Sequence, residues 1–66
     1  MPAGTVTQFD DYVGLGEVTD VDGTVFVFHC VEIADGSRTI DVGIDVDFDV
    51  RVKFGNAEAA RLRPRP

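Results

Sequence analysis

His29 and Cys30 are neighbours in the sequence, and a cysteine activated by a histidine is a common enzymatic nucleophile. Both lie in an apolar, β-branched segment that predicts a strand, where adjacent side chains point to opposite faces. The two side chains should therefore diverge, and the sequence has no second histidine to assist them. We interpret Cys30 as a small buried hydrophobic residue, and we expect a binding protein, not an enzyme.

Asp20-Val21-Asp22-Gly23 is similar to the start of a calcium-binding loop. A complete loop has glycine at its sixth position and glutamate at its twelfth. Here those positions are Val25 and Val31, so the calcium interpretation fails. One cysteine and one histidine are also too few for a structural zinc site. We therefore expect no metal and no other cofactor.

Phe54 has the surroundings that best suit a nucleic acid, because it lies among Arg51, Lys53 and Arg61. An aromatic ring beside cations can stack on a base while the cations contact phosphates. The alternative is a hydrophobic plug for a loop. Tyr12 follows the first predicted strand, and it either contacts bases too or covers one end of the fold.

The charge is divided unevenly along the chain. Twelve acidic residues against six basic ones give a net charge of −6. Residues 1–50 contain eleven of the acids and one base, Arg38, whereas residues 51–66 contain five bases and one acid. Nucleic-acid binding proteins are usually basic, so this balance opposes such a function. A net charge of this size also simply keeps a small protein dispersed.

Two charged groups have open interpretations. The first is an acidic stripe that consists of Asp41, Asp45, Asp47 and Asp49. It either meets a basic partner or forms a solvated edge that discourages strand addition. The second is a basic group that consists of Arg61, Arg63 and Arg65. It either contacts phosphate or pairs with the acidic part of the same chain.

Length and composition predict a single small domain. A chain of 66 residues buries only about 60% of its unfolded surface, and its single cysteine excludes an internal disulfide. With 44% hydrophobic and 27% charged residues, the chain should fold. No apolar run approaches the ~20 residues of a membrane span, and no leader is evident, so we expect a soluble cytoplasmic protein without membrane contact. We predict a domain over residues 1–62 and a frayed basic tail over 63–66.

Strands dominate the predicted secondary structure. Hydrophobic and polar residues alternate from Val42 to Val52, which predicts a half-buried strand. Further strands are predicted over 5–9, 14–19 and 25–29, with a hairpin turn at Asp22-Gly23. Residues 34–37 and Gly55-Asn56 are predicted loops. Residues 57–62 have helical propensities but are too short for a stable helix, so we predict a fifth strand there. Five short strands without a convincing helix favour a small barrel, which removes exposed edges by closing.

Five segments of the chain resemble, in order, those of bacterial cold-shock domains. The family's opening Gly-Lys-Val-Lys-Trp-Phe-Asn strand is matched by Gly4-Thr5-Val6-Thr7-Gln8-Phe9-Asp10. Its two ribonucleoprotein motifs are matched by Val13-Gly14-Leu15-Gly16-Glu17-Val18 and Phe26-Val27-Phe28-His29-Cys30-Val31-Glu32-Ile33. Its later Gly-x-x-Val-x-Phe-x-Val strand and closing Gln-Ala-Ala are matched by residues 43–50 and 58–60.

The resemblance implies a five-stranded antiparallel barrel of the oligonucleotide-binding (cold-shock) type. It also implies weak, sequence-tolerant binding of single-stranded RNA or DNA on the outer face. Alternation along the strands turns Phe26 and Phe28 inward and places Leu15, Glu17 and Val27 outward. The predicted contact residues are Phe9, Tyr12, Leu15, Val27, His29 and Phe54 for bases, and Arg38, Arg51 and Lys53 for phosphates.

Several positions depart from the family pattern. Gln8 stands where the family has tryptophan, and the family's phenylalanines are replaced at Leu15, Glu17, Val27 and Cys30. Lysines are replaced at Thr5, Thr7 and Val13. These changes favour an alternative function, in which the barrel binds a protein partner through the patch around Leu15 and Val27 and no longer binds nucleic acid. The same patch leaves self-association open.

Overall fold

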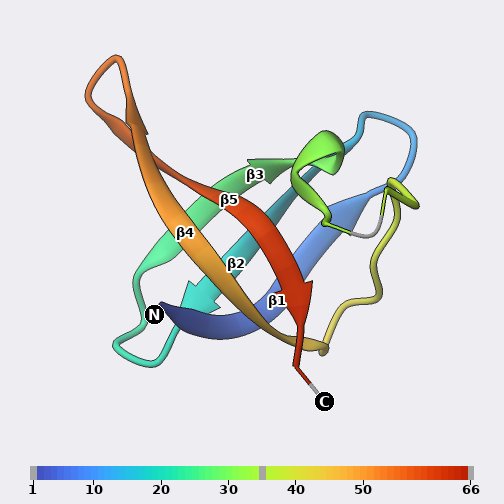
Figure 1. The fold of residues 1–66 in the computed structure, drawn as a ribbon, viewed down its shortest axis with the longest axis horizontal. Coiled ribbons are helices and arrows are strands. Elements are labelled where there is room, and N and C mark those ends of the chain that lie inside the picture. Colours follow the sequence, from blue (N-terminus) through green and yellow to red (C-terminus); the bar gives the residue numbers. More distant parts are fainter. Residues whose placement is uncertain (1, 35, 66) are drawn as a thin grey trace.

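The computed structural model describes residues 2–34 and 36–65, which form five strands and a short 3-10 helix (Figure 1). The elements are β1 (Ala3–Asp10), β2 (Leu15–Asp20), β3 (Val25–His29), η1 (Cys30–Glu32), β4 (Asp45–Lys53) and β5 (Asn56–Pro64). All five predicted strands are present. Residues 57–62 belong to β5, which confirms the prediction of a strand in that segment.

The five strands form one sheet that closes on itself in the order β1-β2-β3-β5-β4 (Figure 1). Four of the strand pairs are antiparallel, whereas β3 and β5 are parallel. The predicted antiparallel arrangement therefore holds at four of the five strand pairs and not at this one. Strand directions cannot alternate around a closed ring with an odd number of members, so a five-stranded ring needs at least one parallel pair.

The interior of the closed sheet is filled by apolar side chains from every strand. Its largest fully buried members are Phe28, Phe48, Leu62, Val6, Val18 and Val46. Phe26 packs on Phe48 with ring centroids 5.4 Å apart and a tilt of 56°. Burial of one such ring stabilises the fold by about 1.5–3 kcal/mol. Ile33, just after η1, is also buried and bridges to Leu62, so the helix closes one end of the core.

The predicted faces of β2 and β3 are confirmed. Phe26 and Phe28 are buried, and the alternate residues Val25, Val27 and His29 are exposed. On β2, Val18 is buried and Leu15 lies on the outer face, opposite His29 in the register. Val27 and Glu17 are also register partners, so the outer surface of these two strands is continuous.

Phe9 differs from its predicted position on that outer surface. A bulge in β1 falls between Val6 and Gln8 and inserts one extra residue opposite β2. Because a one-residue shift exchanges the two faces of a strand, Thr7 and Gln8 are both exposed and Phe9 turns inward. The ring of Phe9 stacks on Phe28, with centroids 5.9 Å apart and an angle of 5° between the planes.

Strand β4 begins later than predicted and continues beyond the core. Val46 and Phe48 are buried, as the alternation predicted, but Val50 and Val52 are 44% and 69% exposed. Val42 and Ile44 precede the strand. The part of the β4–β5 hairpin that includes Val52 therefore projects past the closed sheet, at the upper left of Figure 1.

The end of the chain is more ordered than the predicted tail over 63–66. Strand β5 continues to Pro64, and the Arg65 amide donates a 2.9 Å hydrogen bond to the Asp45 carbonyl. Proline is tolerated at the end of a strand, where one missing amide proton does not interrupt the ladder.

Asp35 of the predicted 34–37 loop and Pro66 of the tail lie outside the described residues. No helix among those described is long and apolar enough to span a membrane.

Gly16 provides a test of how tightly β1, β2 and β3 approach one another. A Cβ atom at this position would lie 2.6 Å from Cζ of Phe28 and 2.7 Å from the Gln8 carbonyl oxygen. We expect Gly16→Ala to lower the free energy of unfolding by about 1–3 kcal/mol, because the core ring and the β1 backbone must both shift. Urea unfolding followed by circular dichroism measures the loss. Val21→Ala, at an exposed turn residue, is the control and should change stability by less than about 0.5 kcal/mol.

Candidate nucleic-acid interface

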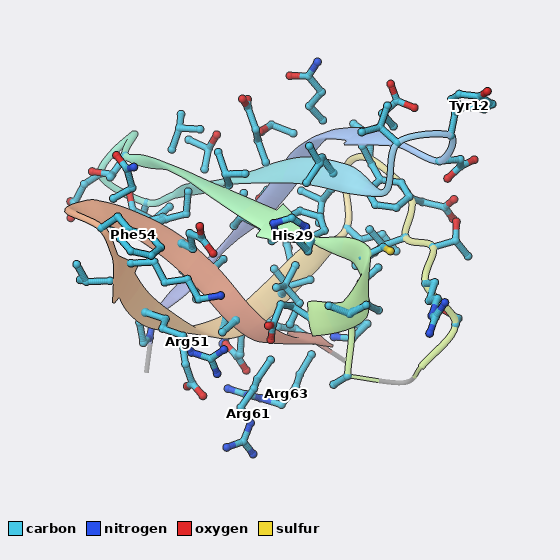
Figure 2. The ribbon with its side chains drawn as sticks, turned by 90° about the horizontal axis from the view of Figure 1, so that it is seen from above. Tyr12, His29, Arg51, Phe54, Arg61 and Arg63 are labelled. Atoms are coloured by element: carbon cyan, nitrogen blue, oxygen red, sulfur yellow. The ribbon has the colours of Figure 1, made fainter. Side chains whose placement is uncertain are left out.

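The exposed aromatic residues lie at the two ends of the molecule. Tyr12 is in the β1–β2 loop and Phe54 is at the tip of the β4–β5 hairpin, and both side chains are fully exposed. Figure 2 shows them at opposite ends, with His29 of β3 between them. They do not form one cluster of rings, so the structure does not bring the predicted base-contacting residues together on a single platform.

Phe54 occupies a strained turn. Lys53 and Asn56 are the last register partners of β4 and β5, so Phe54 and Gly55 form a two-residue turn. Their φ angles are +50° and +80°, as in the type I′ turns that favour Asn-Gly. The turn lies one residue earlier than the predicted Gly55-Asn56. A phenylalanine in the left-handed region costs about 1–2 kcal/mol, and this one gains no burial in return because its side chain is 101% exposed.

A hollow lies beside the hairpin where β3 and β5 diverge. These parallel strands share one registered pair, Val27 with Glu58. Towards the hairpin they separate, and a hollow of about 480 Å³ remains, lined by Val25, Val27, Asn56, Ala57 and Glu58. Its walls combine apolar side chains with one amide and one carboxylate. Its size and lining suit a flat organic group that is held partly by apolar contact.

The cations predicted to contact phosphates differ in their availability. Arg51 forms an ion pair with Glu32, with Nη1 and Oε2 3.4 Å apart. Within residues 2–34 and 36–65, neither Lys53 nor Arg38 has an ion-pair partner. Lys53 adjoins Phe54 at the hairpin, whereas Arg38 lies in the long connection between η1 and β4. Lys53 is therefore the free cation beside the exposed ring.

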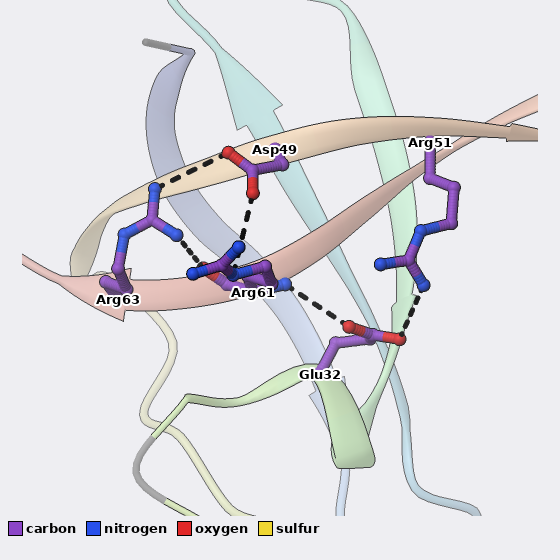
Figure 3. Close-up of polar contacts among 5 residues, drawn as sticks. All are labelled: Glu32, Asp49, Arg51, Arg61 and Arg63. Carbon is purple, nitrogen blue, oxygen red and sulfur yellow. Dashed lines mark hydrogen bonds and ion pairs between the residues drawn. The ribbon is translucent and has the colours of Figure 1, made fainter.

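The arginines of β5 pair with the acidic stripe of β4 (Figure 3). Oδ2 of Asp49 lies 3.7 Å from Nε of Arg61, and Oδ1 of Asp49 lies 3.6 Å from Nη2 of Arg63. Oδ1 of Asp47 lies 3.4 Å from Nε of Arg65. Of the two interpretations of the basic group, the structure shows pairing within the chain. The acidic stripe is not a free edge either, because β4 is paired on both sides.

Glu32 joins this charged network from η1. Its Oε1 accepts a 3.3 Å hydrogen bond from the backbone amide of Arg61, which has a positive φ of 54° (Figure 3). The register of β5 shifts in the same region, between the partners of Asp47 and Asp49. Glu32 thus links the 3-10 helix to an irregular point of β5 and also holds Arg51.

The predicted platform is apolar and contains no stacked rings. Leu15 and Val27 lie together on the outer face, and His29 is the register partner of Leu15. Gln8 replaces Phe9 at the β1 side of this surface because of the bulge. Carboxylates of Asp10 and Glu17 lie at its border, so phosphates would be repelled here.

The thiol of Cys30 is free and partly buried, packed against the core, as the sequence interpretation of a small hydrophobic residue implies. The described residues contain no group of three or more potential metal ligands. Sequence reasoning did not identify Val25, Asn56 and Ala57 as the lining of a hollow beside the hairpin. The Val42–Val52 alternation, followed by Lys53, Phe54 and Gly55, predicted a long strand and a turn, but no sequence signal showed that the hairpin projects past the core.

The Asp49 ion pairs should make a small, salt-dependent contribution to stability. The carboxylate is 43% exposed, and exposed pairs typically contribute about 0.2–1 kcal/mol each. We expect Asp49→Asn to lower the free energy of unfolding by about 0.5–1 kcal/mol at low salt and by less at high salt. Chemical denaturation at the two salt concentrations measures this. Asp41→Asn removes a carboxylate that has no ion pair among the described residues, and an equal loss there would contradict the assignment.

Replacing Phe54 should relieve the backbone strain of its turn and raise the stability of the fold. Asn-Gly is the preferred sequence for a two-residue turn with positive φ angles. Phe54→Asn should therefore raise the free energy of unfolding by about 0.5–1 kcal/mol, because no packing is lost from a fully exposed ring. Thermal and urea unfolding measure the gain. Phe54→Ala, which keeps a side chain unsuited to the turn, is the control and should give a smaller increase.

No family model and no curated protein matches this chain. Nothing in these comparisons identifies the cold-shock family, so that resemblance depends on the residues quoted above. What the surfaces bind has to follow from their exposure, charge and geometry.

Proposed function

We propose that the protein is a small barrel of the oligonucleotide-binding (cold-shock) type that binds single-stranded RNA or DNA weakly and without strong sequence preference. In this proposal the main contact is the projecting β4–β5 hairpin, not the centre of the β2–β3 face. The observation that carries it is the fully exposed ring of Phe54, held in a strained turn beside the unpaired Lys53. Binding is the function, with no catalytic step, and the proposed location is the cytoplasm.

The closed strand order supports the fold type. Barrels of the oligonucleotide-binding type have five strands and bind their ligands on the face of strands 2 and 3 and with the loops that join strands 1–2 and 4–5. In this chain the corresponding loops are the two that carry Tyr12 and Phe54. Phe54 thus lies in one of the two loops with which that architecture binds a strand.

The strain at Phe54 supports a role in binding. A turn chosen only for stability would have asparagine or glycine at this position, and a ring placed only for packing would be buried. A base stacked on an aromatic side chain contributes about 1–3 kcal/mol and does so for any base. Stacking would therefore compensate for a ring that the isolated fold holds at a cost.

Charge restricts the path of a bound strand. Lys53 provides a phosphate contact next to Phe54, whereas Asp10 and Glu17 repel phosphates on the β1–β2 side of the face. The favoured path leaves Phe54, crosses the hollow lined by Val27 and Ala57, and continues towards His29. Few free cations and a net charge of −6 make the binding weak.

We expect Phe54→Ala to weaken binding of hexathymidylate and hexauridylate at least fivefold, the lower end of what one stacked base contributes. The measurement is an NMR titration of the labelled protein at low salt. Tyr12→Ala is the matched control, because it removes an equally exposed ring from the opposite end, and it should change affinity less than twofold. Lys53→Gln should weaken all strands alike and reduce the salt dependence, with a slope change of about 0.7 in log K against log salt.

The titration also separates the proposal from its alternatives. Shifts centred on Lys53, Phe54 and Ala57 that fade as salt rises support it. Equal losses for Tyr12→Ala and Phe54→Ala would show that the strand spans the whole face, which contradicts the confined path. A flat titration at millimolar oligonucleotide would refute nucleic-acid binding and leave the alternative of a protein-interaction barrel.

A further inference from the structure

A second hollow lies at the opposite end of the β2–β3 face from Phe54. It has a volume of about 310 Å³, and its apolar wall consists of Val13, Leu15 and Val27. These side chains are 61%, 37% and 43% exposed. Val25, also exposed, continues the apolar surface along β3. The hollow is open to solvent and continues into a longer apolar track, with room for one side chain and contact surface for its neighbours.

Two carboxylates and one amide complete the lining, from Asp10, Glu17 and Gln8. Asp10 Oδ1 accepts hydrogen bonds from the amides of Tyr12 (2.9 Å) and Val13 (3.2 Å), which fixes this carboxylate. Its Oδ2 and both carboxylate oxygens of Glu17 have no hydrogen bond or ion pair within the described residues. Acceptors from two adjacent strands are thus available at the border of an apolar hollow.

None of the ion pairs among the described residues involves Asp10 or Glu17. The sequence has no lysine or arginine before Arg38, whereas residues 1–37 contain seven acidic side chains. The arginines of β5 are paired with Asp47 and Asp49, on the other strands of the ring. The negative charge around Asp10 and Glu17 is therefore uncompensated within the described fold, and it favours a positively charged occupant.

We propose that this hollow binds an arginine side chain, flanked by apolar residues, in an extended segment of a partner protein. The guanidinium would donate hydrogen bonds to Glu17 and to Oδ2 of Asp10, while its aliphatic stem packs on Leu15 and Val27. The flanking apolar residues would occupy the track towards Val25. A phosphate-bearing ligand is disfavoured by the two carboxylates, and a simple polyamine has no side chains for the apolar track. In a second copy, the arginines of β4 and β5 are already paired, and Arg38 lies between Ser37 and Thr39, without the flanking apolar residues that the track would hold.

This site shares Val27 with the hollow proposed for nucleic acid, and its apolar track reaches Val25, which also lines that hollow. Asp10 and Glu17 belong to this site alone and Phe54 to the nucleic-acid contact alone, so shifts at these residues show which of the two proposals fails. The test is an NMR titration with acetyl-Leu-Arg-Leu-Arg-Leu-amide. We expect shifts at Leu15, Glu17 and Val27 and none at Phe54. The same peptide with citrulline in place of arginine keeps the shape without the charge and should bind at least fivefold more weakly. A version with glycine in place of leucine should also bind at least fivefold more weakly.

Glu17→Gln should lower affinity for the arginine peptide at least threefold, and it should fold because its carboxylate has no partner to lose. Asp22→Asn is the matched control, since it removes the same charge from the β2–β3 turn, and its affinity should stay within 1.5-fold of the wild type. Equal binding of the citrulline peptide, equal losses in both variants, or no shifts at millimolar peptide would overturn the proposal. So would shifts at Asp10 and Glu17 that follow protein concentration without peptide, or that follow hexathymidylate.

Discussion

A closed sheet of five strands cannot have all its neighbours antiparallel, and this parity constraint shapes the rest of the molecule. The unavoidable parallel pair falls between β3 and β5, which share one registered pair, Val27 with Glu58. Farther along, the ring is closed by the Ile33–Leu62 bridge and by the hydrogen bond from the Ala34 amide to the Leu62 carbonyl. Because β3 and β5 meet over so short a length, the start of β5 diverges from β3. The hollow beside Ala57 and the projecting hairpin with Phe54 both follow from this divergence.

The two outer surfaces differ in how their charges are balanced. On β4 and β5, carboxylates and guanidiniums face each other across one antiparallel pair, and most of the positive charge is used within the fold. On β1 and β2, the carboxylates of Asp10 and Glu17 border apolar side chains and form no ion pair among the described residues. Lys53, at the hairpin end, is a cation that has no ion-pair partner among the described residues. One barrel thus presents an aromatic ring with a free cation at one end and an apolar hollow with free carboxylates at the other.

Alternation and turn signals in the sequence were sufficient to predict the first four strands, the inward phenylalanines of β3 and the outer faces of Leu15 and Val27. The fifth strand was predicted because residues 57–62 are too short for a stable helix. Alternation was insufficient at Phe9, because a bulge at Thr7 reverses the faces of β1 and leaves no local signature in that segment. It was also insufficient at Val50 and Val52, since a strand pattern does not show where the core ends. The pairing of Arg61, Arg63 and Arg65 was one of two options, and only the register between β4 and β5 decides it. The parallel pair, by contrast, follows from the strand count once closure is assumed.

The unpaired charges of the surface also affect how the molecule approaches a charged ligand. Asp10 and Glu17, on β1 and β2, form no ion pair among the described residues, and Lys53, at the hairpin, is a cation without one. In solution such a particle does not approach a charged body in random orientations, because the field exerts a torque on it before contact. A polyanion would meet the hairpin end first, and a polycation would meet the β1–β2 end first. The molecule would therefore turn a different end towards an anionic and a cationic ligand before any side chain contacts either of them.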